Sequence, residues 1–193
     1  FRDKMAAALA RLGVPTPVDE YLAAPQEDLS LVLLPKSFQV AGDTFDERFV
    51  FVGPCLAERK FLGEWTPPRD GRPLVLVSLG TMGTKDGHAA EFFSTCAKAF
   101  ADVPWNVVMT LGPRTDPAEL GELPPNVEAH QWVPHVSVLE HAAVMVTHGG
   151  MGSVMETLSV GRPLVVVPHL AAMATADQVA GLGLGRVLPP AEL

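Results

Sequence analysis

The chain has 193 residues, of which 48% are hydrophobic and 19% are charged. This length suits one domain with a buried core, or one domain and part of another, and the composition excludes a disordered segment. The 14 Lys and Arg residues against 22 Asp and Glu residues give a net charge of −8. That balance argues against a nucleic-acid binder or a binder of anionic membranes, which need a basic surface.

The cysteine count and the apolar runs point to the compartment. Cys55 and Cys96 cannot form a disulfide framework and lack the spacing of metal ligands, so we expect a reducing compartment. The longest apolar runs, 29–34 and 164–167, are far shorter than the roughly 20 residues that a transmembrane helix needs. No stretch has the pattern of a signal peptide. We therefore expect a cytoplasmic protein, and the charged start without an initiator Met suggests a piece of a longer one.

The first part of the chain is predicted to hold few regular elements. A short helix is expected over 4–12, ended by Gly13. The apolar run 29–34 is typical of a buried strand, and 49–52 of a second strand. Residues 58–72 are charged and contain Pro-Pro and Asp-Gly pairs, which indicates an interdomain linker.

From residue 73 onwards, strands and helices alternate. Strands are expected at 74–79, 105–111, 127–131, 144–147 and 164–167, and helices at 89–100, 136–141, 151–160 and 172–182. In the first of these helices, Phe92, Cys96 and Phe100 share one face, and Gly183 stands where a helix-ending glycine belongs. This alternation predicts an α/β fold, a doubly wound parallel sheet with helices on both faces.

The most informative segment is an apolar strand that runs directly into His148, Gly149 and Gly150, after which a helix begins. Glycines allow a sharp turn and bring backbone N–H groups close to a ligand, and a helix N-terminus attracts a phosphate. Ser153 adds a hydroxyl to this turn, and Glu156 adds a carboxylate that can accept hydrogen bonds from ribose. The segment therefore predicts a phosphate site.

The alternative for this segment is a capping box. Ser153 and Glu156 have the spacing of that motif, which would merely start a helix at Val154. Such a start leaves 149–152 as a glycine-rich loop without an explanation.

Two further segments support nucleotide binding. Ser78 and Thr81 stand at the end of the first strand of the second region, and ligands of open α/β sheets bind at that edge. An ordinary strand–helix turn would look the same. Trp132 follows a short strand, where its indole could stack on a nucleobase or pack in the core. His135, just before a helix, fits a solvated turn equally well.

These segments together resemble a known family. The motifs are SLGT (78–81), WVPH (132–135) and THGGMGSVMETLSVGRPLVVVP (147–168). They resemble the donor half of GT-B glycosyltransferases, in particular the bacterial enzymes that modify macrolides, aromatic polyketides and enediynes, with the calicheamicin type the most similar. The resemblance implies two Rossmann-like domains, of which 73–193 is the nucleotide-sugar donor domain and 1–57 the end of the acceptor domain.

The resemblance also implies the chemistry and its residues. The family is inverting and uses a nucleotide diphosphate sugar as co-substrate, with no metal and no other cofactor. The donor site implied for this chain consists of Ser78, Thr81, Trp132, Val133, His148, Gly149, Gly150, Ser153 and Glu156. In it, Trp132 stacks on the base, the Val133 backbone bonds to the base, His148 and the turn bind the diphosphate, and Glu156 binds ribose.

The sequence departs from the family at the sugar. Many relatives have an Asp-Gln pair a few residues after the last motif, where this chain has the mostly apolar segment 169–173. Asp177 and Gln178 come too late in the sequence, and we expect them on a helix surface. His169 and Ala171 are the candidate sugar-binding residues of this segment. A pocket that otherwise lacks hydroxyl-binding groups suits a deoxygenated sugar, because polar groups buried without partners are costly. We therefore expect a dTDP-deoxysugar or dTDP-aminodeoxysugar rather than UDP-glucose.

The catalytic base is expected outside this chain. In the family, a His near the start of the N-terminal domain, oriented by an Asp, deprotonates the acceptor hydroxyl, so this chain alone should bind donor weakly and transfer nothing. His88, His130 and His141 lack a carboxylate partner in the sequence pattern and are expected on the surface. The expected partners are the nucleotide sugar and a natural-product acceptor. A homodimer is a further expectation.

Three other functions share some of these features. A GT-B-like epimerase of UDP-amino sugars would need carboxylates where this chain has Ala171 and Ala172. A non-catalytic nucleotide-binding module would keep the donor site as a scaffold. A dinucleotide-dependent oxidoreductase ranks lowest, because the turn from Gly80 to Gly83 lacks the third glycine and the later acidic residue of its fingerprint.

Overall fold

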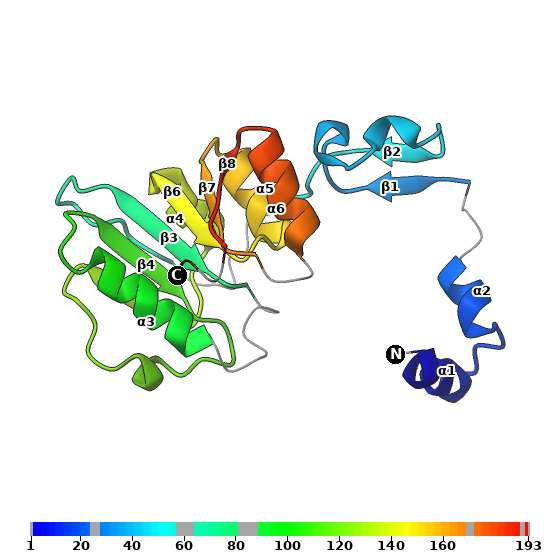
Figure 1. The fold of residues 1–193 in the computed structure, drawn as a ribbon, viewed down its shortest axis with the longest axis horizontal. Helices are drawn as coiled ribbons and strands as arrows, with labels where there is room; N and C mark the ends of the chain where they lie inside the picture. Colours follow the sequence, from blue (N-terminus) through cyan, green and yellow to red (C-terminus); the bar gives the residue numbers. More distant parts are fainter. Residues whose placement is uncertain are drawn as a thin grey trace.

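A six-stranded parallel sheet forms the centre of the second region of the chain (Figure 1). The computed structural model describes residues 2–23, 28–56, 64–80, 89–168, 172–189 and 192. The strands are β3 (Leu74–Ser78), β4 (Asn106–Thr110), β5 (Val127–His130), β6 (Val144–Thr147), β7 (Leu164–Val166) and β8 (Gly185–Val187). They lie in the order β5-β4-β3-β6-β7-β8, and every neighbouring pair is parallel. The predicted α/β fold is confirmed.

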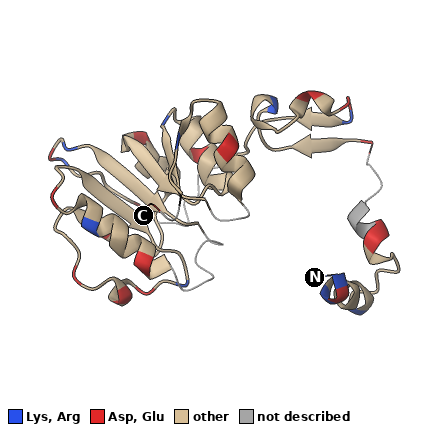
Figure 2. Ribbon diagram, in the orientation of Figure 1, with Lys and Arg blue, Asp and Glu red and all other residues tan. Residues whose placement is uncertain are grey.

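Helices cover both faces of this sheet (Figure 1). The helices are α3 (Ala89–Phe100), α4 (His135–His141), α5 (Met151–Ser159) and α6 (Met173–Gly181). Side chains alternate along each strand, so Val75 and Val77 pack with α3 on one face, whereas Leu74 and Leu76 pack with α4, α5 and α6 on the other. Figure 2 shows that the central strands β3, β4 and β6 carry no charged residue, as expected of strands buried on both faces.

The order of the strands creates a switch point. The chain leaves β3 through α3 toward β4 and β5, and returns through α4 to place β6 on the opposite side of β3. The loops that follow β3 and β6 therefore diverge, and a crevice at the carboxyl ends of these two strands is the usual ligand site in such a sheet.

Two elements were not predicted from the sequence. The helix α2 (Val18–Ala23) lies in the first region, and β8 is the edge strand of the sheet, beside β7. Only one residue of β8 is β-branched, so its composition gives little strand signal. A Cβ atom at Gly185 would collide with the backbone of Leu164 on β7. The glycine allows the close approach that makes this short pairing possible. The predicted helix-ending glycine, Gly183, has a φ of +67° and is confirmed.

The first region contains a small parallel sheet. This sheet is formed by β1 (Ser30–Val32) and β2 (Phe49–Phe51). The first region also contains α1 (Arg2–Arg11), α2 and the 3₁₀ turns η1 (Lys36–Phe38) and η2 (Gly42–Thr44). The strand predicted over 29–34 is shorter, and its burial was predicted wrongly: Leu29, Leu31 and Leu33 are 58%, 60% and 53% exposed. Among the described residues, β1 pairs with β2 alone, and a two-stranded sheet offers too little surface to bury both faces.

Polar side chains close the amino-terminal edge of the six-stranded sheet. The Asn126 amide, before β5, donates to the carbonyl oxygens of Phe100 (2.9 Å), Val103 (3.4 Å) and Trp105 (2.7 Å). Asp70, before β3, accepts from Arg72 Nε at 2.7 Å and from Asn106 Nδ2 at 2.8 Å. These bonds, chiefly the one from Arg72, lower the pKa of Asp70 to about 2.

No helix in the described part of the chain is both long enough and apolar enough to pass through a bilayer. Both cysteines are free thiols, Cys55 on the surface and Cys96 on the buried face of α3. Burial raises the pKa of Cys96 to about 12, which makes it an inert core residue.

Candidate nucleotide-sugar site

A row of buried hydroxyl groups marks the carboxyl edge of the sheet at the switch point. Thr110, Ser78 and Thr147 end β4, β3 and β6 and lie side by side in register. They are at most 3% exposed. By the alternation along the strands, they face α4 and α5. Ser78 Oγ accepts from the Gly80 N–H at 3.2 Å, so this hydroxyl shapes the loop after β3.

The turn after β6 depends on glycine at position 149. Gly149 has a φ of +89°, a region that L side chains rarely adopt, and a Cβ atom there would lie 2.8 Å from Cγ1 of Val166. The Gly149 N–H points back to Thr147 Oγ1 at 3.4 Å. This amide therefore helps to form the turn and is not directed at a ligand.

His148 lies between the two loops of the switch point. A Cβ atom at Gly80 would lie 3.0 Å from Cε1 of the His148 ring, and a Cβ atom at Gly150 would lie 2.7 Å from Cε1 and Nε2. The imidazole therefore fits only because both neighbouring residues lack a side chain. The ring links the end of β3 to the start of α5.

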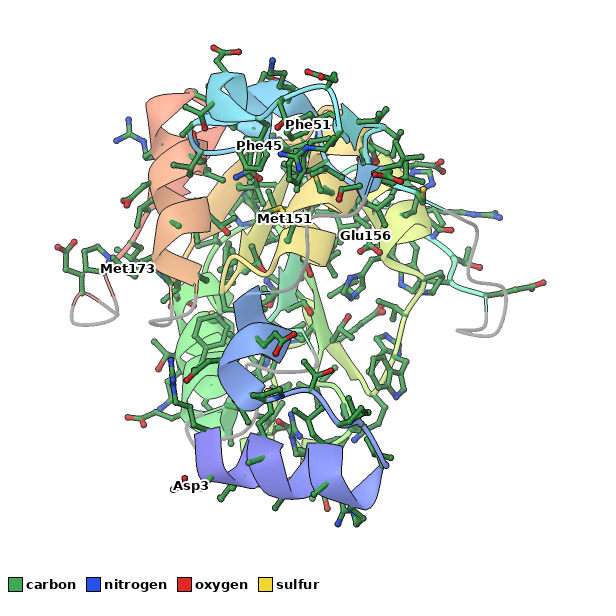
Figure 3. All side chains as sticks on the ribbon, turned by 90° about the vertical axis from the view of Figure 1, so that its right-hand side faces the viewer. Asp3, Phe45, Phe51, Met151, Glu156 and Met173 are labelled. Carbon is green, nitrogen blue, oxygen red and sulfur yellow. The ribbon has the colours of Figure 1, made fainter. Side chains whose placement is uncertain are left out.

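The helix α5 begins at Met151 (Figure 3). Gly150 is its N-cap, and no side chain caps it. The capping-box interpretation, with a start at Val154, is therefore wrong, and Ser153 lies within the first helical turn. Val154 N–H donates to the Gly150 carbonyl at 3.0 Å. Within the described residues, no acceptor is found for the amides of residues 150–153. These amides and the helix dipole form an anion-binding end.

The loop between β5 and α4 presents Trp132. Its side chain is 44% exposed, so the alternative that it packs in the core is wrong. Val133 is 3% exposed and packs with the core cluster of α4, so only its backbone can face a ligand. The neighbouring Gln131 amide donates to the Thr115 carbonyl at 2.9 Å, which ties this loop to the loop after β4.

Glu156 is a buried carboxylate, 5% exposed, on the α4 side of α5 (Figure 3). Its Oε2 atom lies 3.4 Å from Nδ1 of His135, the first residue of α4. The other ring nitrogen, Nε2, is 3.1 Å from Thr110 Oγ1. The interpretation of His135 as a solvated turn residue is wrong, because its side chain is only 16% exposed. No local sequence signal connects these three residues, which come from three separate elements.

Comparison with known proteins identifies the family of this chain. The sequence model of the family described as erythromycin biosynthesis protein CIII-like, C-terminal domain, matches residues 94–193. The chain belongs to this family. The EryCIII-like match begins within α3 and includes Trp132, the turn after β6 and α5.

Individual relatives of this EryCIII-like chain are named glycosyltransferases. The NDP-glycosyltransferase YjiC of Bacillus subtilis is 46% identical over 175 residues, which are 90% of this chain and 44% of YjiC. The crystal structure of the calicheamicin glycosyltransferase CalG4 superposes with a TM-score of 0.77 at 50% identity over 99% of this chain and 48% of CalG4. VinC, solved with dTDP, gives a TM-score of 0.54 at 28% identity over 73% of this chain and 34% of VinC. The chain thus spans less than half of each relative, and the predicted GT-B fold is confirmed.

Three predicted site residues of the EryCIII-like chain lie outside the described residues: Thr81, His169 and Ala171. His88, which was expected on the surface, lies outside them as well. Asp177 and Gln178 lie within α6, exposed and half-buried, as predicted. His130 differs from the prediction, because its Nε2 atom lies 3.1 Å from Glu128 Oε2, although both side chains are on the surface as expected. The described part of the chain contains no group of three or more His, Cys, Asp or Glu residues placed to hold a metal ion.

Proposed function

We propose that the complete protein is an inverting glycosyltransferase that moves a sugar from a nucleoside diphosphate to a natural-product acceptor. The observation that carries this proposal is the N-terminus of α5, which stands at the switch point with the His148 ring beside it and no acceptor for its first amides among the described residues. Membership of the EryCIII-like family and the similarity to CalG4 support a natural-product acceptor such as an enediyne or polyketide.

The donor nucleotide lies across the carboxyl edge in this proposal. The base stacks on the exposed indole of Trp132, and the ribose reaches Glu156. The diphosphate occupies the end of α5. When the glycosidic bond breaks, negative charge develops on the leaving diphosphate, and the helix N-terminus and His148 stabilise it without a metal ion.

The sugar is a deoxysugar or aminodeoxysugar carried on dTDP. The segment that follows β7 begins with apolar residues and contains neither carboxylate nor amide before Asp177. Hydroxyl groups of a fully oxygenated sugar would be buried there without partners, which disfavours UDP-glucose. The structure of VinC with dTDP supports the choice of nucleotide.

The acceptor and its base belong to the half of the relatives that this chain does not match. We place the residue that deprotonates the acceptor hydroxyl there, and no catalytic base among the residues of this chain. This assignment of the donor site to one half and of the acceptor and its base to the other follows from a two-domain architecture, in which each half contributes one face of the cleft.

Calorimetric titration of the complete protein with dTDP and UDP tests nucleotide binding. Replacing Trp132 by Leu should weaken both by about tenfold, because a base–aromatic stack contributes roughly 1–3 kcal/mol, while Trp132→Phe should retain most of the affinity. Absence of binding by the wild type would leave only a scaffold role.

A donor panel tests the reaction. We expect faster turnover with a dTDP-deoxysugar than with UDP-glucose, and unchanged turnover after treatment with EDTA. Faster turnover with UDP-glucose than with any dTDP-deoxysugar would contradict the proposed sugar, and loss of activity in EDTA would contradict a metal-free mechanism.

A further inference from the structure

A chain of three side chains connects the sheet edge to Glu156. Thr110 ends β4, His135 begins α4 and Glu156 lies in the middle of α5. Thr110 Oγ1 and His135 Nε2 are 3.1 Å apart, and His135 Nδ1 and Glu156 Oε2 are 3.4 Å apart. Each nitrogen of the imidazole thus has its own partner, and the two partners come from different elements.

The three side chains that form this network are all largely buried. The side chains of His135 and Glu156 are 16% and 6% exposed, and Thr110 is 3% exposed. A carboxylate removed from water needs a polar partner, and His135 Nδ1 lies 3.4 Å from its Oε2 atom. The contact with Thr110 holds the imidazole ring of His135 in one orientation. Rotation of the ring by half a turn would place carbon atoms where the two nitrogens lie, and the contacts with Thr110 and Glu156 would both be lost. The direction of the Glu156 carboxylate is therefore set from the sheet.

We propose that His135 is a positioning residue that orients the Glu156 carboxylate toward the sugar ring of the nucleotide and thereby determines how strongly the site discriminates for its hydroxyl group. This inference rests on the proposed nucleotide site. His135 acts through Glu156, and Thr110 acts through His135. The hydroxyl that ends β4 thus contributes to ligand selectivity without facing the ligand.

The test compares two nucleotides that differ by one hydroxyl group. Calorimetry on the complete protein gives Kd for dTDP and for 3′-deoxythymidine diphosphate. The wild type should bind dTDP at least about tenfold more tightly, the effect of one hydrogen bond to a charged group. In His135→Leu this ratio should fall to less than about threefold, because a wrongly directed carboxylate no longer distinguishes the two ligands.

Three variants separate positioning from general damage. Thr110→Val, which keeps the shape of the side chain, should lower the ratio in the same direction and decides the question if His135→Leu does not fold. His135→Gln should restore the ratio, since an amide can donate to Glu156 and still bond to Thr110. His141→Leu, at the exposed end of the same helix, should leave both Kd values unchanged.

The outcomes distinguish this inference from the proposed function. A wild type that binds neither nucleotide overturns both. A wild type that binds both equally overturns the inference alone, as does a full ratio retained in folded His135→Leu or Thr110→Val. Equal weakening of both nucleotides in these variants, with the ratio intact, would assign His135 a structural role and also overturn the inference.

Discussion

The two edges of the six-stranded sheet use polar groups in opposite ways. At the amino edge, the side-chain N–H group of Asn126 donates to three backbone carbonyls, and Asp70 accepts from Arg72 and Asn106, so these donors find their acceptors within the protein. At the carboxyl edge, the buried hydroxyls shape loops instead. The first amides of α5, at the same edge, have no acceptor among the described residues.

The difference shows how one sheet separates stability from binding. Groups satisfied internally stabilise the fold and offer nothing to a ligand, whereas an unsatisfied helix end costs little when it faces water and gains when an anion arrives. Substitutions at the amino edge should therefore change stability alone. Substitutions at the carboxyl edge should change nucleotide binding, alone or together with stability.

The largest effect is expected from Gly149→Ala. The alanine would have to keep the positive φ of Gly149, and its Cβ atom would lie 2.8 Å from Cγ1 of Val166. Strain and overpacking together should lower the free energy of unfolding by about 3 kcal/mol, and the displaced turn should abolish detectable nucleotide binding. Urea denaturation and calorimetry measure the two effects. A loss below about 1 kcal/mol would show that the turn can relax, contrary to this account.

Asn126→Ala should affect stability only. Its removal leaves the Phe100 and Trp105 carbonyls without their amide donor, which should cost about 2 kcal/mol in urea denaturation. Nucleotide affinity of the folded variant should remain that of the wild type. Asp102→Ala, a substitution of an exposed residue at the same edge, is the control and should change stability by less than about 0.5 kcal/mol. A Kd altered by Asn126→Ala would break the separation of the two edges.

Gly150→Ala should affect binding more than stability. Gly150 has a φ of −61°, which any residue accepts, but its Cβ would lie 2.7 Å from the His148 ring and push it aside. We expect Kd for dTDP to rise about tenfold, the loss of one charge-assisted contact. Gly181→Ala in α6 is the matched control, because a Cβ there meets nothing within 4 Å. Equal Kd values for the Gly150→Ala and Gly181→Ala variants would contradict the assignment of His148 to the diphosphate site.

The smallest effect concerns acid stability. The pKa of Asp70 is about 2 in the folded protein, chiefly because of Arg72, and about 3.9 in an unfolded chain. Its contribution is therefore complete above about pH 4 and is lost as the pH falls toward 2. Asp70→Asn should flatten the decline of stability in this window, and Arg72→Met should do the same. Unfolding curves recorded between pH 2 and 5 measure the slope, and an unchanged slope in both variants would contradict the assigned ion pair.

Much of the second region of the chain could be predicted from local patterns. The helix over Ala89–Phe100 and the strand over Val144–Thr147 were predicted to the residue, because their apolar spacing and their flanking residues agree. The glycine turn and the membership of a glycosyltransferase family were also within reach of the sequence, since each depends on residues that are close together in the chain. The exposure of Trp132 was decided by the structure, because its local pattern left stacking and core packing both open.

Other features depended on what surrounds a residue in space. The leucines at 29–33 form an apolar run typical of a buried strand, yet they are exposed, because burial requires a second layer that no local pattern specifies. Conversely, the short β8 lacks a strand pattern and forms because Gly185 lets two backbones approach.

The sequence by itself determined the period of the strands and helices, the positions of the turns and the residue types at the proposed nucleotide site. Only the tertiary structure decided which of those residues meet. Thr110, His135 and Glu156 are 25 and 21 positions apart, and the parallel sheet brings them together because all its strands end at the same edge. Local chemistry fixes an element, whereas contact between elements depends on strand order and packing, which no short segment encodes.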